Sequence, residues 1–422
     1  MSLMVIMSLP AVKPTCKAND QTHRMQPMQA AVAPIHPFPA RMAPEVALVQ
    51  FESLPRSARV LDPLCGSGTV LRVAAESGRQ AIGFDLDPLA VLMAKVWTTP
   101  IDTSGLRSAA DALLKEAAAM SVAAARLPWL DDDPDTRAYV DYWFAEPQRS
   151  DLRRLAAALR GVGGATGDAL RIALSRIIIT KDHGASLARD VSHSRPHRVR
   201  TGNDFPVFPG FARSVGRLAE RLETQPPPGR VRVSQGDARS LASLPSESVD
   251  AVVTSPPYLN AIDYLRGHRL SLVWLGYRIH ELRNLRSQSI GTECGLAAHA
   301  SWSLADELSQ PLGSLDGLPS AERGMVKRYV LDLHALVEEI HRVVRPGGRV
   351  VFVVGNSCLR GVFIRNAELL TYIAERAGFV LLSNTERALP PNRRYLPPPG
   401  QFSPNDLRKR MRTETVLTLR RA

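Results

Sequence analysis

Apolar and polar residues alternate in the first half of the chain as they do in a strand–helix–strand unit. Short apolar runs predict strands, and amphipathic stretches of ten or more residues predict helices. A glycine turn, CGSG, separates the first strand from the helix after it, so a parallel sheet is implied. The expected order is a helix at 42–54 with Pro44 in its first turn, a strand at 58–64, a helix at 69–78, a strand at 79–86 and a helix at 88–97.

The same alternation returns in the second half of the chain. Apolar runs predict strands that alternate with long amphipathic helices. We therefore expect an α/β core made of residues 34–100 and 230–422. The expected elements are strands at 231–238 and 249–258, a helix at 327–344, a turn at 345–348, a strand at 349–356, a helix at 366–378, and strands at 379–386 and 413–421.

Residues 101–229 interrupt this pattern and predict a large, mainly helical insertion. Alanine-rich helices are expected at 106–127, 151–161 and 168–180, followed by a loop crowded with Arg and His and a rigid QPPPGR linker. A second interruption, at 259–324, is expected to be an irregular loop insertion with one helix at 266–277. Residues 1–33 show no periodicity and are expected to form a flexible leader.

The composition is that of a soluble globular protein with a basic surface. Hydrophobic residues make up 45% and charged residues 22% of the chain, enough for a sizeable core. The formal net charge of +12 favours a polyanionic partner, although GC-rich coding DNA produces the same excess of arginine. No segment approaches the ~20 apolar residues of a membrane span, so we expect a cytoplasmic protein with no membrane partner.

The four cysteines are scattered, which supports neither a disulfide framework nor a metal site.

Three acidic residues at successive strand ends suggest a cofactor site. In DPLCGSGT, Gly66 and Gly68 let a ligand approach the backbone, and Asp62 suits an amino group better than a pyrophosphate. Asp85 ends the next strand, where an acid accepts hydrogen bonds from a ribose diol, and Asp237 is placed to receive an adenine amino group. Each feature by itself is commonly a tight turn or a helix cap. Together they favour S-adenosylmethionine over a dinucleotide.

The sharpest motif is TSPPY, which follows the apolar run at 249–253. Two prolines fix a rigid turn at the carboxyl end of the sheet, where α/β proteins bind ligands. An exocyclic amino group on a base is a poor nucleophile, so its catalyst needs hydrogen-bond acceptors rather than a covalent nucleophile. The Ser255 hydroxyl and a proline carbonyl offer such acceptors, and Tyr258 offers a surface on which a flipped base can stack. An ordinary proline-rich loop is the alternative reading.

These motifs resemble those of the amino-methylating DNA methyltransferases. TSPPY resembles their catalytic motif, (D/N/S)PP(Y/F), while VLDPLCGSGT and IGFDLDP resemble their cofactor motifs. HPFPARMAPEVA, at 36–47, resembles their N-terminal motif, which helps to enclose the methionine end of the cofactor. RPGGRVVFVVGN, RYLPPP and RTETVLTLRR resemble their later segments. The resemblance covers about residues 35–100 and 230–421.

The resemblance implies a Rossmann-like class I methyltransferase fold with a mostly parallel seven-stranded sheet, S-adenosylmethionine as cofactor and double-stranded DNA as substrate. The implied catalytic residues are Ser255, Pro256, Pro257 and Tyr258. The implied cofactor-binding residues are Asp62, Cys65, Gly66, Ser67, Gly68, Thr69, Asp85, Asp237 and Ala238.

Two details bear on which base is modified. A serine in the first motif position is typical of cytosine-N4 members and is shared by some adenine-N6 members, so cytosine N4 is favoured. A cytosine-C5 enzyme needs a cysteine nucleophile, usually after a proline, and no cysteine here follows a proline. The insertion between the second-strand acid and the third strand fits no standard motif order, which leaves target recognition open.

Basic residues of two segments are the candidates for DNA contact. Segment 179–203 carries Arg and Lys among Ser and His, a composition suited to phosphates, although a solvated loop has the same composition. Further arginines follow the catalytic turn. The candidates are Lys181, Arg189, Arg195, Arg198, Arg200, Arg266 and Arg269.

Three other functions compete with this reading. An RNA amino-methyltransferase would use the same core, a DNA-binding cofactor sensor would have lost activity, and a nicotinamide dehydrogenase would give TSPPY no role. The sequence leaves open the recognised site, the oligomeric state and whether a companion restriction endonuclease exists.

Overall fold

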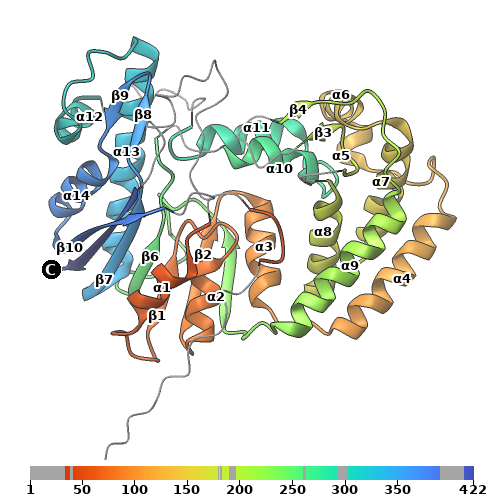
Figure 1. The fold of residues 1–422 in the computed structure, drawn as a ribbon, viewed down its shortest axis with the longest axis horizontal. Helices are drawn as coiled ribbons and strands as arrows, with labels where there is room; N and C mark the ends of the chain where they lie inside the picture. The colour runs from red at the N-terminus through yellow and green to blue at the C-terminus, as the bar shows by residue number, and fades with distance from the viewer. Residues whose placement is uncertain are drawn as a thin grey trace, which may run out of the picture. The chain divides into compact units, whose positions relative to one another are not determined.

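Seven strands pair in one sheet, and both halves of the chain contribute to it. The computed structural model describes residues 34–38, 41–178, 180, 183–189, 196–259, 263–292, 302–389 and 413–422. In sheet order the strands are β10 (Phe379–Ala388), β11 (Thr413–Arg421), β7 (Val344–Val354), β6 (Val249–Thr254), β1 (Arg59–Asp62), β2 (Gln80–Asp85) and β5 (Val231–Gln235) (Figure 1). β11 runs antiparallel to both of its neighbours, and the other pairs are parallel. The expected mostly parallel seven-stranded sheet is confirmed.

Helices cover both faces of this sheet, because alternate residues of a strand face opposite sides. Val60 and Val351 face one core cluster, which includes apolar residues of α1, α2 and α3. Leu61 and Phe352 face the other cluster, which includes residues of α13 and α14. The covering helices are α1 (Pro44–Phe51), α2 (Thr69–Glu76), α3 (Pro88–Thr98), α13 (Ser320–Val343) and α14 (Asn366–Arg376).

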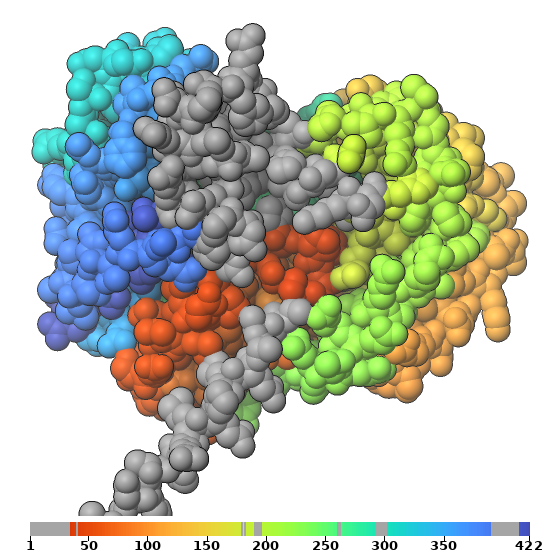
Figure 2. All heavy atoms as spheres, viewed as in Figure 1, coloured from red at the N-terminus to blue at the C-terminus, as the bar shows by residue number. Residues whose placement is uncertain are grey.

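The insertion between β2 and β5 is mainly helical, as expected. Its elements are α4 (Thr103–Ala119), α5 (Pro128–Asp131), α6 (Pro134–Trp143), α7 (Glu146–Leu159), α8 (Gly164–Ile178), the short strands β3 (Ala188–Arg189) and β4 (His197–Arg198), and α9 (Val207–Thr224). α8 packs against both α9 and the core helix α3, so it joins the insertion to the core. On the face shown in Figure 2, the red N-terminal part of the described chain lies between the blue C-terminal half and the yellow-green insertion helices.

Several elements of the insertion differ from expectation, including α5 and α6, which were not predicted. The helix expected at 106–127 ends at Ala119, because its buried stripe of Leu106, Ala110, Leu113 and Ala117 has no continuation. Helix α9 was expected to be loop. Its apolar residues, which include Val207, Phe211, Val215, Leu218 and Leu222, recur at the spacing of a helix, so its own sequence carried the helical signal.

The segment expected to hold one helix in an irregular loop contains several elements. The predicted helix at 266–277 is observed as α10 (Tyr264–Leu272), and α13 begins earlier than expected. The additional elements of this segment are α11 (Ile279–Gln288), α12 (Trp302–Leu308) and the 3₁₀ turn η2 (Gln310–Leu312). A short antiparallel pair, β8 (Ser357–Leu359) and β9 (Val362–Ile364), lies between β7 and α14. α10 packs against α8 and α3, and α11 packs against α6, so this segment also rests on the insertion.

Two further findings concern the described residues alone. No helix among them is long and apolar enough to cross a membrane. No group of three or more His, Cys, Asp or Glu side chains among them is placed to hold a metal ion. Cys65 and Cys358 are free thiols, whereas Cys16 and Cys294 lie outside the described residues.

Candidate active site

The predicted cofactor and catalytic motifs meet at one edge of the sheet. β5, β2, β1 and β6 are consecutive parallel strands, so their carboxyl ends lie side by side. β1 ends at Asp62, β2 ends at Asp85, and Asp237 lies two residues beyond the end of β5. β6 ends at Thr254, immediately before the Ser-Pro-Pro-Tyr turn.

A buried hydrogen bond joins the cofactor strand to the catalytic strand. The Thr254 hydroxyl donates to Asp62 Oδ1 at 2.7 Å, and both side chains are buried. Because Ser255 is the next residue after Thr254, the catalytic turn begins beside the predicted glycine turn. The two motifs, far apart in sequence, therefore begin side by side at this edge of the sheet.

Both glycines of the turn are needed for their backbone conformation, and each also allows a different close contact. Both have a positive φ, 51° at Gly66 and 90° at Gly68, which side chains rarely adopt. A Cβ on Gly68 would lie 2.9 Å from the Cβ of Ala94 in α3, so this glycine permits close packing of the turn on α3. A Cβ on Gly66 would lie 3.1 Å from Phe38 Cε1, so the Phe38 ring lies over this part of the turn.

The other predicted residues of the turn are buried around it. The Cys65 backbone N–H donates to the Phe84 carbonyl at 2.8 Å, which ties the turn to β2. Ser67 and Thr69 are buried as well, Thr69 as the first residue of α2.

Two buried carboxyl groups give the site its electrostatic character. Burial raises the pKa of Asp62 to about 7, against the hydrogen bond from Thr254. Burial and the charge of Asp87 raise the pKa of Asp85 to about 6, while Asp85 accepts a hydrogen bond from the Gly66 N–H at 2.8 Å. A buried carboxylate without a cation is costly. The site therefore suits a ligand that brings positive charge to one acid and hydroxyl donors to the other.

Asp237 has a protein partner. Arg239 Nη2 lies 2.7 Å from Asp237 Oδ2, and the same guanidinium also contacts Asp332 of α13 and donates to the Gln288 carbonyl. The side chain of Asp237 is still 32% exposed, so it is accessible to a ligand. Ala238, the other predicted residue here, is buried.

The catalytic turn is tethered on both sides. The Ser255 hydroxyl donates to the Val353 carbonyl of β7 at 2.8 Å, which uses its proton and leaves the oxygen free to accept. The Tyr329 hydroxyl of α13 donates to the Pro257 carbonyl at 3.1 Å. Pro256, between these tethers, is buried, and Tyr258 is half-buried against the core.

Four residues near this edge lie outside the implied catalytic and cofactor-binding sets, although one of them, Phe38, belongs to the N-terminal motif predicted at 36–47. Phe38 stacks on Tyr264 of α10 with ring centroids 4.9 Å apart and an interplanar angle of 19°. His268 of α10 is buried and is paired through Nδ1 with Asp87, which also caps α3. Asp87 before Pro88 is a recognisable helix-cap sequence, but nothing local in the sequence indicates that it meets His268.

The predicted DNA-contacting residues separate into three groups. Lys181 and Arg195 lie outside the described residues. Arg189, Arg198 and Arg200 are exposed on or beside the β3–β4 pair, with the Arg198 guanidinium 5.2 Å from the centroid of the Tyr142 ring. The third group is Arg266 and Arg269.

These two arginines of α10 have intramolecular contacts. Arg266 lies 3.1 Å from Asp263, and the Arg269 guanidinium lies 5.7 Å from the centroid of the Tyr139 ring in α6. Burial also lowers the pKa of Arg269. Arg269 therefore connects α10 to the insertion, a role that its sequence position did not indicate.

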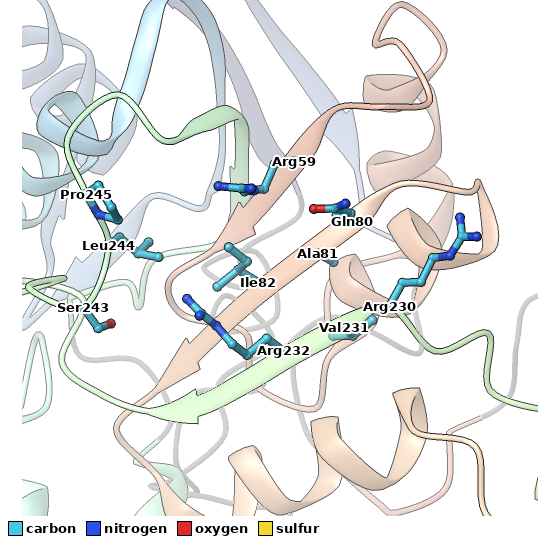
Figure 3. A pocket seen from close by; sticks show the side chains of 10 residues that line it. All are labelled: Arg59, Gln80, Ala81, Ile82, Arg230, Val231, Arg232, Ser243, Leu244 and Pro245. Carbon is cyan, nitrogen blue, oxygen red and sulfur yellow. The ribbon is translucent and has the colours of Figure 1, made fainter.

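A cavity of about 580 Å³ lies at the opposite end of the strands. It is lined by the first residues of β1 and β2, Arg59 and Gln80, and by Arg232 near the start of β5. Figure 3 shows Arg59, Ile82 and Leu244 around this hollow, with Arg230 directed away from them. Because the predicted motifs all lie at the carboxyl ends of these strands, this cavity is separate from the candidate active site.

The chain is similar in sequence to known proteins. No family model matches the chain. The type II methyltransferase M.MvaI of Kocuria varians is 23% identical over 403 residues, which cover 88% of this chain and 86% of that protein. The chain is thus similar to a type II methyltransferase over most of its length. The resemblance to DNA methyltransferases seen in its motifs is thereby confirmed.

Two further proteins are also similar to the chain. The type II methyltransferase M.BsoBI of Geobacillus stearothermophilus is 27% identical over 168 residues, which cover 33% of each chain. Among solved structures, a TehB-like SAM-dependent methyltransferase from Corynebacterium glutamicum aligns with a TM-score of 0.28 and 12% identity over 90% of this chain and 88% of that chain.

Proposed function

We propose that this protein is an S-adenosylmethionine-dependent DNA methyltransferase that modifies the exocyclic amino group of a flipped base, cytosine N4 in preference to adenine N6. One observation carries the proposal. The hydrogen bond from Thr254 to Asp62 sets the Ser-Pro-Pro-Tyr turn beside the glycine turn, at the edge where three strand-end acids gather. That is the arrangement needed for direct transfer between two ligands.

The acids fit the cofactor part by part. Asp62, whose buried carboxyl lacks a cation, would hold the ammonium group, and Asp85 would accept from the ribose hydroxyls. Asp237, exposed enough to reach a ligand, would accept from the adenine amino group. When bound, the cofactor supplies an electrophilic methyl group on a sulfonium.

The chain's own contribution to the reaction is to hold and activate the target amino group. The Ser255 oxygen, whose proton is already donated to Val353, accepts one N–H of that group. The carbonyl of Pro256 is the acceptor for the second N–H. With both N–H bonds held, the nitrogen can pyramidalise towards the methyl group. The half-buried Tyr258 ring offers a face on which the extruded base stacks.

The choice of DNA and of cytosine rests on two supports. The relatives with the most extensive similarity are named type II methyltransferases, and the exposed arginines at 189, 198 and 200 suit a phosphate backbone. The serine at the first position of the catalytic motif favours cytosine N4, by resemblance to that subgroup.

Methyl transfer from labelled cofactor to duplex DNA, tRNA and rRNA tests the proposal. We expect label in duplex DNA alone, with release of N4-methylcytosine on nucleoside digestion. Ser255→Ala and Tyr258→Ala should each lose most of this activity and keep cofactor affinity. Label in RNA and none in DNA, or full activity in both variants, would contradict the proposal.

A further inference from the structure

We propose that the helical insertion completes the cofactor site: its helix α8 fixes residues 34–38 so that the Phe38 ring covers the glycine turn. Ser175 and Arg176 are then positioning residues for cofactor binding. This inference rests on the proposed cofactor, and it gives the insertion a role separate from DNA contact.

Two contacts fasten the 34–38 segment to α8. His36 Nε2 lies 2.9 Å from the Ser175 hydroxyl oxygen, which lies 2.9 Å from the Ser271 hydroxyl oxygen in α10. The Arg176 guanidinium donates to the Ile35 carbonyl. His36, Ser175 and Ser271 are all buried, so water cannot replace these partners.

The link through His36 is directional. The Pro37 carbonyl can only accept, so His36 Nδ1, 2.7 Å away, carries the proton and donates to it. Burial lowers the pKa of His36 to about 3, which keeps the ring neutral. Nε2 can then only accept, so the Ser175 hydroxyl donates to it and the Ser271 hydroxyl in turn donates to Ser175. Removing the Ser175 hydroxyl leaves a buried acceptor without its donor.

The other end of the segment carries the ring over the cofactor turn. Phe38 Cε1 lies 3.1 Å from where a Cβ on Gly66 would be, and the ring stacks on Tyr264 of α10. The His268 ring centroid lies 5.7 Å from that of Phe38, and His268 is paired with Asp87, two residues after the cofactor acid Asp85.

Helix α10 therefore contacts Phe38 at one end of the segment and contacts α8 through Ser271, while α8 holds Ile35 and His36. A change in α8 should move Phe38 without touching the acids at the strand ends. The affinity for the part of the cofactor that lies over the glycine turn should fall most. The turn follows Asp62, which in the proposed function holds the cofactor's ammonium group, so that part is the methionine end.

Calorimetric titration of the full chain, without DNA, tests this with two ligands. S-adenosylmethionine carries the methionine end, and 5′-methylthioadenosine lacks it. We expect Ser175→Ala to raise the Kd for S-adenosylmethionine about tenfold, the typical cost of an unpaired buried polar group. The Kd for 5′-methylthioadenosine should change less than about twofold. Arg176→Gln should likewise raise the Kd for S-adenosylmethionine and leave the Kd for 5′-methylthioadenosine nearly unchanged.

Two further variants separate positioning from general damage. Ser214→Ala removes a buried hydroxyl that bonds only within the insertion, to the Ala173 carbonyl, and should change neither Kd. Phe38→Ala should also raise the Kd for S-adenosylmethionine more than the Kd for 5′-methylthioadenosine. The double variant Phe38→Ala, Ser175→Ala should bind S-adenosylmethionine no more weakly than Phe38→Ala alone, because Ser175 acts through Phe38.

Failure of this inference can be distinguished from failure of the proposed function. If wild type binds S-adenosylmethionine while Ser175→Ala and Arg176→Gln bind both ligands as wild type does, or weaken both equally, the inference is overturned and the function stands. If wild type binds neither ligand, the proposed function fails and this inference fails with it.

Discussion

Burial and a bound cationic ligand would have opposite effects on the pKa of Asp62, at the end of β1. Burial raises its pKa to about 7, so the folded protein holds this carboxyl less readily in its charged form than the unfolded chain does. A cationic ligand reverses that preference by supplying the missing charge. Asp62 therefore lowers the stability of the ligand-free protein at neutral pH in favour of binding.

This opposition predicts a pH-dependent effect of Asp62→Asn on stability. Because the folded pKa is raised, the stability that Asp62 contributes is complete below the unfolded pKa and is lost as pH rises through about 7. The variant, which cannot ionise, should gain about 2–3 kcal/mol over wild type between pH 5 and pH 8. Urea unfolding at several pH values measures this difference. A difference that does not vary with pH would show that Asp62 is not a buried acid.

Tyr329 provides a second prediction at the level of a single residue. Prolines have no N–H, so the rigid catalytic turn depends on outside partners such as the Tyr329 hydroxyl on the Pro257 carbonyl. Tyr329→Phe keeps the buried ring and removes this tether. We expect kcat to fall about tenfold with little change in KM for DNA, since positioning is lost and binding is kept.

The control for Tyr329→Phe is Tyr372→Phe, on helix α14, which also removes a tyrosine hydroxyl and should leave kcat unchanged. Equal kcat values for Tyr329→Phe and wild type would remove Tyr329 from the account.

Residues at strand ends could be predicted from the sequence, and their partners could not. Asp62, Asp85 and Ser255 were identifiable because a buried apolar run fixes where each strand ends. The stacking of Phe38 on Tyr264 depends on how distant segments meet, which no local pattern records.

Among the elements, the turn between β1 and α2 owes its shape to packing against α3. Gly68 has a φ of 90°, and an added Cβ would lie 2.9 Å from the Ala94 Cβ and 3.0 Å from its Cα. Neither atom can move without shifting α3. The glycine pattern that suggests a ligand site in the sequence is thus partly a requirement of helix packing.

Gly68→Ala is accordingly expected to destabilise the protein by about 2–4 kcal/mol, through backbone strain and overpacking. Gly163→Ala is the matched control, because Gly163 has no atom within 4 Å of an added Cβ, and its effect should be small. Thermal and urea unfolding of the two variants measure the difference. Similar stabilities would contradict the packing argument.

Core elements were predictable because a buried strand or a two-faced helix imposes a period on the sequence. The strands at β1, β2 and β6 were found for that reason. Helix α9 was predicted as loop because an Arg- and His-rich segment precedes it, although its own apolar residues recur at helical spacing.

For the molecule as a whole, the order of motifs along the chain was enough to predict the sheet, and not enough to place the insertion. The four parallel strands of the site bring the predicted cofactor and catalytic motifs together at one edge of the sheet. Where the insertion packs depends on contacts such as α8 with α3 and Arg269 with Tyr139, which no local sequence pattern indicates.

The central claim is that the Ser-Pro-Pro-Tyr turn directs a methyl group onto an amino group of a base in DNA. The most direct measurement is to express the chain in a host without DNA methylation and to sequence that genome for modified bases. The account predicts N4-methylcytosine at one recurring short sequence with the wild-type chain, and no modification with Ser255→Ala at equal protein levels. An unmodified genome in cells that contain the folded wild-type protein, or the same modification with both chains, would contradict it.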